Sequence, residues 1–561
     1  MKQICKHCKE DFEIYTRDEE YYKNMGVPVV EKCPQCRFQL LLSYRNERTL
    51  YQRSCVMCKQ PTLSMYSEDK PYTIYCRECW WSDKWDPLSY GREIDWKRPF
   101  FDQWAELRQE VPRIAMLNDS DSVNSEYTNH VYRLKNCYVV SDACDNEDSL
   151  FCNGIYFVKD CVDCAYVTDH SELCYETMFS EQCYNIRYSR DCHSCRDSSF
   201  LIDCVGVTNS FMCVGLRNKS FCFKNQELSE AEYNKKMQEY QLSSRSKVED
   251  YKKEFAEFAV MVLRKYFHGS NNEDSDGDYI RNNKNVHHCF QTRTSENCSY
   301  CFGIYDAKEC YDNMVWGEQV EKIYMGQAVG GQAYRLLFCN VVWHGQENYY
   351  GDNCLNGAQF VFGCISLKKQ KYCILNKQYS EKDFLVLKDK LIQHMEQTGE
   401  WGNYFPIKYS LFNYNESHAN EFFPLCKEEA KAKGWQWQDS LPGTVGKETI
   451  HKIPDDIADV NNSIIKEIVC CSNCKKNFKY VEAEFNFYKK LNIPLPDKCP
   501  SCRHQVRSRE FPSFKLFNRQ CMCEITEHNH DDKCPIEFKT TYNPNKPEIV
   551  YCEACYKKEI Y

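Results

Sequence analysis

Apolar and polar residues alternate in short runs through two long central segments of the chain. Runs such as "ELCYE", "EQCYN" and "LIDCV" alternate over four or five positions and end in Ser, Asn or Asp turns. Alternation with period two is typical of short β-strands. Cysteines mark the runs at nine-residue intervals, as at Cys183 and Cys192 and again at Cys204, Cys213 and Cys222. This short repeat predicts a β-solenoid, in which like residues stack rung upon rung; an irregular β-sandwich is the alternative.

The two central segments are related to each other. "FMCVGLRNKSFCFKNQELSE" (211–230) matches "FGCISLKKQKYCILNKQYSE" (362–381) at an offset of 151 residues, and Asn225 falls on Asn376. Cysteine suits an inner column because a free thiol behaves as a small hydrophobe. We therefore expect two β-solenoid-like units of the same architecture, unit A over 120–228 and unit B over 278–378.

A helical period follows each of these units. "VEDYKKEFAEFAVMVLRKYF" places Phe255, Phe258 and Val262 on one face, and "SEKDFLVLKDKLIQHM" starts at a potential N-cap, Ser380. These patterns predict a multidomain, mainly β protein with helical segments. The expected order is an N-terminal double zinc module (1–87), a linker or helical stretch (88–119), unit A, helices (229–268), unit B, helices (379–436), a linker (437–466) and a C-terminal double zinc module (467–561).

The two ends of the chain are copies of one module. Comparison of the N-terminal segment with the residues 466 positions later needs no gap over fifty residues. Five cysteines coincide in the two copies: Cys5, Cys8, Cys33, Cys36 and Cys55 fall on Cys471, Cys474, Cys499, Cys502 and Cys521.

The spacing of these cysteines is that of metal ligands. Structural zinc takes four ligands in a tetrahedron, with sulfur at about 2.3 Å, and two C-x2-C turns supply four thiolates. The predicted sets are Cys5, Cys8, Cys33 and Cys36; Cys55, Cys58, Cys76 and Cys79; and Cys471, Cys474, Cys499 and Cys502. Cys521, Cys523, Cys552 and Cys555 form a fourth set, in which Cys534, His528 or His530 could replace one ligand. About four structural Zn²⁺ sites are expected; buried thiols without metal are the alternative.

The opening "CKHCKEDFEIYTRDEEYYKNMGVPVVEKCPQCRF" resembles the small treble-clef "probable zinc-ribbon" domain. The residues that carry the likeness are Cys5, Cys8, Phe12, Tyr22, Gly26, Pro28, Cys33, Pro34, Cys36 and Arg37. The C-terminal copy departs from this pattern with Asn492 in the place of Gly26. The layout of the whole chain resembles uncharacterised zinc-ribbon proteins of candidate-phyla bacteria. The likeness implies a metal and a fold, but no reaction.

By this resemblance the second C-x2-C opens a helix from which basic residues project. The candidate nucleic-acid-binding residues are Arg37, Arg45, Arg48, Arg53, Arg503, Arg507, Arg509 and Arg519. Basic side chains bind phosphates, and the aromatic residues between them could stack on bases. Two other interpretations are a solvated helix face and an acidic protein surface within the chain itself, since residues 120–225 hold 15 acidic and 9 basic residues.

A catalytic interpretation has weaker support. Asp142, Asp145, Asp148, Asp160, Asp163 and Asp169 form an acidic band, and some solenoid enzymes that cleave polysaccharides use paired carboxylates. The frequency of Asp in turns explains the band more simply. The pairs Cys161/Cys164, Cys192/Cys195 and Cys298/Cys301 could bind a further metal with His170 or His193, although stacked structural thiols are the simpler prediction.

Composition sets the remaining bounds. The chain has 561 residues, 39 cysteines and a net charge of −9, which excludes a uniformly basic nucleic-acid coat. No apolar signal segment opens it, and no stretch approaches 18 consecutive apolar residues. We expect a cytoplasmic, non-enzymatic zinc-binding scaffold, with nucleic acid as one candidate partner. A protein-interaction scaffold without nucleic acid is the alternative, and an enzyme with a site in the solenoid groove is the least favoured prediction.

Overall fold

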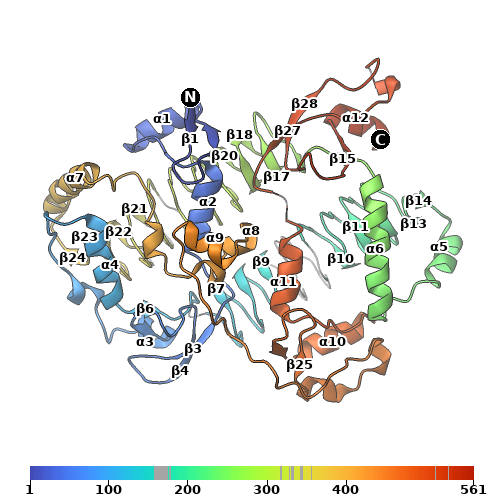
Figure 1. The fold of residues 1–561 in the computed structure, drawn as a ribbon, viewed down its shortest axis with the longest axis horizontal. Helices are drawn as coiled ribbons and strands as arrows, with labels where there is room; N and C mark the ends of the chain where they lie inside the picture. The colour runs from blue at the N-terminus through green and yellow to red at the C-terminus, as the bar shows by residue number, and fades with distance from the viewer. Residues whose placement is uncertain are drawn as a thin grey trace.

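The fold is built from many short strands in small sheets and from helices that lie around them. The computed structural model describes residues 1–119, 121–156, 175, 178–315, 317, 319–327, 329, 334–341, 345–355, 357–511, 513–528 and 530–560. Within these residues the chain forms 12 α-helices and sheets of two to five strands. Two stacks of strands occupy the centre, and the two ends of the chain lie over them (Figure 1).

Stack A (118–227) is a ladder of short parallel strands. Its strands are β7 (Asn129–Tyr132), β8 (Ser141–Cys144), β9 (Asn153–Tyr156), β10 (Tyr184–Arg187), β11 (Arg196–Ile202), β12 (Phe211–Val214), β13 (Cys222–Phe223) and β14 (Gln226–Glu227). Ser141 pairs with Asn153, and Ser199 pairs with Phe211, so one rung takes 12 residues. Among the described strands of this stack, only the last pair, β13 with β14, is antiparallel.

The backbone turns at every third residue within a rung. Asp142, Asp145 and Asp148 have φ angles of 54°, 56° and 56°, and the residue after each of them is buried. Asn and Asp tolerate this left-handed region better than most residues, which explains their frequency here. Turns every three residues divide a 12-residue rung into four sides. The nine-residue cysteine interval therefore spans three sides of a rung and is not the repeat itself.

Stack B (269–378) is built in the same way. It contains β16 (Gly269–Ser270), β17 (Gly277–Arg281), β18 (Lys284–His287), β19 (Cys289–Arg293), β20 (Glu296–Ser299), β21 (Gln346–Tyr349), β22 (Gln359–Phe362), β23 (Lys371–Ile374) and β24 (Lys377–Gln378). Both stacks close alike: the side chain of Asn225 accepts from and donates to the backbone of Val214, and that of Asn376 does the same with Ile365. These asparagines are the pair that the 151-residue repeat aligns.

Helices flank each stack. The helices α4 (Phe100–Glu110) and α6 (Arg245–Met261) precede stacks A and B, and α5 (Glu230–Met237) and α7 (Glu381–Gln397) follow them. The Ser380 hydroxyl accepts a hydrogen bond from the Asp383 amide, so Ser380 caps α7. α6 also lies along stack A, where Phe255 meets Phe200 with ring centroids 5.8 Å apart (Figure 1). Two short helices, α8 (Ala419–Phe422) and α9 (Lys427–Ala432), follow α7 in the chain and precede the C-terminal module.

The N-terminal module (1–87) and the C-terminal module (467–561) repeat one order of elements. The first contains β1 (Lys2–Ile4), β2 (Asp11–Glu13), α1 (Thr16–Met25), α2 (Pro34–Ser43), β3 (Tyr51–Ser54), β4 (Pro61–Ser64), β5 (Ile74–Tyr75) and α3 (Arg77–Trp81). The second contains β25 (Val469–Cys470), β26 (Asn477–Phe478), α10 (Glu482–Lys490), α11 (Pro500–Ser508), β27 (Phe517–Gln520), β28 (Glu537–Thr540), β29 (Val550–Tyr551) and α12 (Glu553–Ile560). The offset is 466 up to β27 and 476 from β28 onward, so the C-terminal copy carries ten extra residues between these strands.

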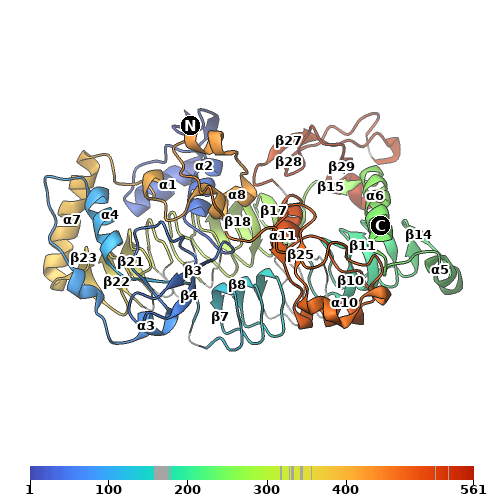
Figure 2. The same cartoon turned by 60° about the horizontal axis from the view of Figure 1, so that its bottom comes forward.

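Each terminal module packs against the stack of the opposite half of the chain. Tyr21 of α1 stacks on Tyr311 of stack B at 3.7 Å, and Tyr488 of α10 packs edge-on to Tyr175 of stack A at 5.6 Å. Two short pairings also tie each module to its own half of the chain: β5 pairs with β6 (Arg113–Ile114) before stack A, and β29 pairs with β15 (Arg264–Lys265) before stack B. In Figure 2, α1 and α2 lie above the strands of stack B, and α10 lies at the lower edge of the molecule, below β10 and β11.

The two ends also meet each other. The ring of Phe38 in α2 lies 4.7 Å from that of Phe514, and the side chain of Gln35 donates a hydrogen bond to the Phe514 carbonyl at 3.2 Å. Phe422 of α8 packs between them, 6.4 Å from Phe38 and 5.0 Å from Phe514. The two modules are thus joined through one aromatic cluster above the stacks.

Candidate metal centres

Four groups of four cysteine sulfurs converge in the terminal modules. In each group the ligand atoms lie within 4.8 Å of one another. The groups are Cys5, Cys8, Cys33 and Cys36; Cys55, Cys58, Cys76 and Cys79; Cys471, Cys474, Cys499 and Cys502; and Cys521, Cys534, Cys552 and Cys555. The first three have the composition that the sequence predicts, and the fourth does not.

Sulfur–sulfur distances within the groups match a tetrahedral site. A metal–sulfur bond of about 2.3 Å gives a tetrahedral edge of about 3.8 Å. The observed distances are 3.7 Å for Cys8–Cys33, 3.8 Å for Cys58–Cys76, 3.7 Å for Cys474–Cys499 and 3.9 Å for Cys534–Cys552. All four groups are therefore close to the size that a tetrahedral metal ion requires.

Local structure favours the thiolate form of Cys33, whereas burial raises the pKa of its C-terminal counterpart Cys499. Cys33 is the N-cap of α2 with Pro34 at the first helical position, and its amide donates to the Cys5 sulfur at 3.2 Å. Cys499, the N-cap of α11, repeats this bond to Cys471. The positive end of a helix stabilises an anion. A hydrogen bond from the Cys36 thiol lowers the pKa of Cys33 to about 5.

In the fourth group the structure brings together a ligand set that the sequence offered as the alternative. Cys534, and not Cys523, completes the tetrad with Cys521, Cys552 and Cys555. Cys521 and Cys523 are only two residues apart, one fewer than in the other turns, and the Cys523 sulfur points instead toward His528, with its Sγ 3.2 Å from Nδ1. Cys523, His528, His530 and Cys555 form a further group within 4.8 Å. The ten extra residues of this copy, in which His528 and His530 lie, are the sequence signal for this difference.

The predicted nucleic-acid-binding arginines are largely used inside the molecule. Arg37 and Arg45 are each 1% exposed. Arg37 donates to Asp312 of stack B at 2.8 Å, and Arg45 donates to Asp142 of stack A at 2.8 Å and to its neighbour Glu47. Burial raises the pKa of Asp142 to about 6 although Arg45 lies beside it. These two arginines therefore hold carboxylates of the chain's own stacks.

The other six arginines differ in exposure. Arg503 is buried, donates to Glu484 at 2.9 Å and lies over the ring of Phe151 at 4.9 Å. Arg507 is also buried. Arg48, Arg53 and Arg519 are half-buried, and Arg509 is exposed. A continuous basic face on α2 or α11 is not formed by the described residues, because its central members point inward.

The other candidate residues that the structure describes form ion pairs, hydrogen bonds or packing contacts within the stacks. Asp145 pairs with Arg133, and Asp148 accepts from Asn136. Cys192 and Cys195, like Cys298 and Cys301, are buried in the inner columns of the stacks. His193 faces Glu181 at 3.5 Å. Six residues lie outside the described part of the chain: Asp160, Asp163, Asp169, Cys161, Cys164 and His170.

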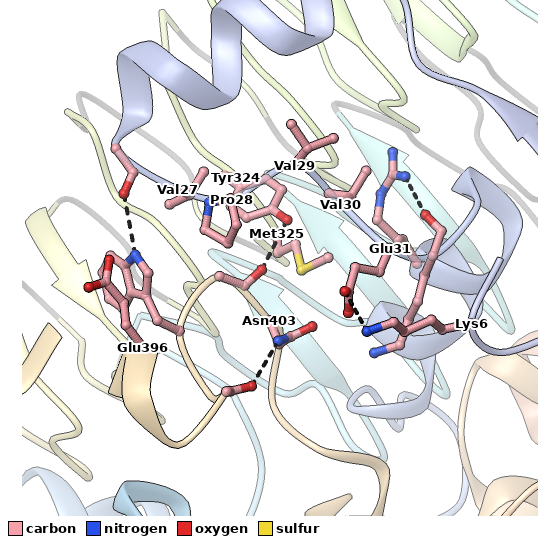
Figure 3. A pocket seen from close by; sticks show the side chains of 16 residues that line it. Lys6, Val27, Pro28, Val29, Val30, Glu31, Tyr324, Met325, Glu396 and Asn403 are labelled. Carbon is pink, nitrogen blue, oxygen red and sulfur yellow. Dashed lines mark hydrogen bonds and ion pairs between the residues drawn. The ribbon is translucent and has the colours of Figure 1, made fainter. Parts of the chain in front are cut away.

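One open pocket of about 620 Å³ lies between the N-terminal module and stack B (Figure 3). It is lined by the segment 26–32, by Tyr324 and Met325, and by the loop after α7. Lys6 and Glu31 form an ion pair of 2.5 Å at its edge. No His, Asp, Ser or Cys is among its described lining residues, and its titratable groups are those of Lys6, Glu31, Lys32, Arg37, Tyr324 and Glu396.

Comparison with protein-family models, with curated proteins and with solved structures finds no match to this chain. None of the helices among the described residues combines the length and the apolar character that crossing a membrane needs. The chemistry of the site must therefore be inferred from its own geometry.

Proposed function

We propose that the protein is a non-enzymatic zinc-binding scaffold. In this proposal the terminal modules are treble-clef zinc ribbons, and the two stacks are β-solenoid units that the modules clamp into one body. The observation that supports it most strongly is the convergence of four thiol tetrads at tetrahedral spacing.

The donor set favours zinc over other common metals. Four thiolates in a tetrahedron are typical of structural zinc and of iron–sulfur sites, whereas Mg²⁺ and Ca²⁺ require oxygen ligands. Each terminal module is too small to be stabilised by its apolar core alone. Thiolates persist as ligands where thiols stay reduced, so we propose a reducing compartment such as the cytoplasm.

We propose a protein, and not a nucleic acid, as the partner of the scaffold. Phosphate binding requires accessible cations. Arg37, Arg45, Arg503 and Arg507 are buried, and the net charge of −9 opposes the approach of a polyanion. Arg37 and Arg45 instead pair with Asp312 and Asp142 of the stacks.

Removal of the metal should disorder the terminal modules. Binding at a structural zinc site contributes on the order of 10 kcal/mol in isolated fingers, which exceeds what such a small core supplies. We expect exhaustive chelation of the full chain under reducing conditions to remove at least four zinc ions and to lower the melting temperature sharply. Metal analysis with circular dichroism checks this, and restored Zn²⁺ is the control. An equally ordered metal-free chain would refute the proposal.

Nucleic-acid binding should be absent or weak. Titration of labelled single-stranded RNA and duplex DNA with the full chain, followed by fluorescence anisotropy, should show no saturable binding at about 0.1 M salt. Arg509→Ala removes the exposed member of the predicted set and should change nothing. Tight binding that falls steeply with salt and weakens in Arg509→Ala would favour a nucleic-acid partner instead.

A further inference from the structure

The C-terminal module gathers more metal-binding groups than one ion can use. Seven donors lie together: Cys521, Cys523, Cys534, Cys552, Cys555, His528 and His530. They divide into two tetrads that have Cys555 in common. We propose that this module binds two metal ions in a dinuclear centre, with the Cys555 thiolate as the bridging ligand. This inference deepens the proposed function and rests on it, since both require thiolate-bound metal.

The distances in the second tetrad fit a tetrahedral ion. Bonds of about 2.3 Å to sulfur and 2.05 Å to nitrogen give a sulfur–nitrogen edge of about 3.6 Å. The Sγ of Cys555 lies 3.7 Å from Nε2 of His530, and the Sγ of Cys523 lies 3.2 Å from Nδ1 of His528. The four donor atoms lie within 4.8 Å of one another, so a single ion could reach all of them.

Both histidines are oriented as metal ligands by a second partner. A zinc-bound histidine usually donates its other ring nitrogen to a carboxylate or a backbone carbonyl, which fixes the ring. His528 turns Nδ1 toward Cys523, while its Nε2 lies 3.2 Å from the Glu559 carboxylate. His530 turns Nε2 toward Cys555, while its Nδ1 lies 2.5 Å from the Asp532 carbonyl. The oxygen partners therefore leave one nitrogen of each ring for an ion.

The N-terminal module provides an internal comparison. Its equivalent tetrad is Cys55, Cys58, Cys76 and Cys79, and the segment 59–75 between the two turns contains neither Cys nor His. In the C-terminal module the longer connection supplies Cys534, which takes the place of Cys58. Cys523 therefore lies outside the first tetrad and can act as a ligand in the second.

Ligand number and charge agree with two ions. Two tetrahedral ions that share one ligand require seven donors, and seven are present. Five thiolates and two neutral imidazoles carry five negative charges, which two divalent ions reduce to one. With a single ion in the four-sulfur site, Cys523, His528 and His530 would converge without a common partner.

Metal counting on the full chain tests this inference. After saturation with Zn²⁺ and removal of excess ions, native mass spectrometry should find five zinc ions in the wild type. The double variant His528→Ala/His530→Ala and the single variant Cys523→Ala should each hold four. His451→Ala alters an exposed histidine outside both tetrads and is the matched control, expected to hold five.

A second measurement requires no substitution. In protein loaded with ¹¹³Cd²⁺, two of the cadmium signals should show mutual scalar coupling, because a shared sulfur connects the two nuclei. Four zinc ions in both the wild type and the double variant would overturn the dinuclear centre and leave the proposed function intact. Five ions without coupling would overturn the bridging role of Cys555, and three or fewer in the wild type would overturn the proposed function itself.

Discussion

Replacement of Cys33 by serine should release one metal ion and unfold residues 1–43, while most of stack A stays folded. Serine is a poor zinc ligand, and loss of one ligand forfeits much of the roughly 10 kcal/mol that structural zinc contributes. The module then loses the stacking of Tyr21 on Tyr311 and the pairing of Arg37 with Asp312, which leaves the buried Asp312 carboxylate without its cation. We expect stack B to loosen around Asp312 as a result.

Native mass spectrometry and hydrogen exchange measure this outcome. The count should fall by one, and the amides of Val27 and Arg37, which donate to Tyr22 and Cys33 carbonyls, should lose protection. Amides of β12 in stack A should keep theirs. Cys426→Ser is the control, because Cys426 is exposed and belongs to none of the tetrads. Unchanged protection of Val27 and Arg37 after loss of the metal would contradict the prediction.

We expect Asp352→Asn to lower the free energy of opening β5 from β6, at the N-terminal end of stack A, by about 3–5 kcal/mol. Arg113 of β6 donates two hydrogen bonds of 2.8 Å to Asp352 of stack B, and both side chains are 1% exposed. Removal of one partner of a buried ion pair leaves an uncompensated charge in the interior. Arg113 would retain the Tyr66 hydroxyl at 3.1 Å, which cannot neutralise it.

Native-state hydrogen exchange can locate this effect. The amides of Arg113 and Ala115 donate to Thr73 and Tyr75 and report the opening of β5 from β6. Asp145→Asn is the matched control, since Asp145 pairs with the half-exposed Arg133 and should cost at most about 1 kcal/mol. The double replacement Arg113→Met/Asp352→Leu should recover part of the loss. Equal losses of opening free energy in Asp352→Asn and in the control would contradict the prediction that the buried pair is more costly to break than the exposed one.

The features that could be predicted from the sequence are those that a few neighbouring residues determine. Ligand spacing within a C-x2-C turn is fixed by a few residues, so three tetrads could be read directly. The rung length could not, because inward positions recur every third residue and cysteine spacings such as Cys183–Cys192 reveal only multiples of three. The register of 12 appears only in pairings such as Ser199 with Phe211.

Contacts between distant segments left little trace in the sequence. Arg37 and Asp312 are 275 residues apart, and no local pattern marks them as partners. The excess of acidic residues over 120–225 did indicate that the arginines could serve the chain itself, and Arg45 with Asp142 is such a pair. Cys534 was recognisable as a possible ligand, but its choice over Cys523 depends on how the connection from β27 to β28 folds back.

The exchange of modules between the halves affects how the chain matures during synthesis. Arg37 leaves the ribosome 275 residues before Asp312, and at roughly 5–20 residues per second this interval lasts roughly 14–55 s. Throughout it the surface of stack B on which α1 and α2 pack is missing, although the part of stack A that Arg45 contacts emerges earlier. The second copy emerges when the platform that it joins is already complete. The two related modules therefore complete their packing at different times: the first waits until stack B is made, and the second can dock as soon as it is made.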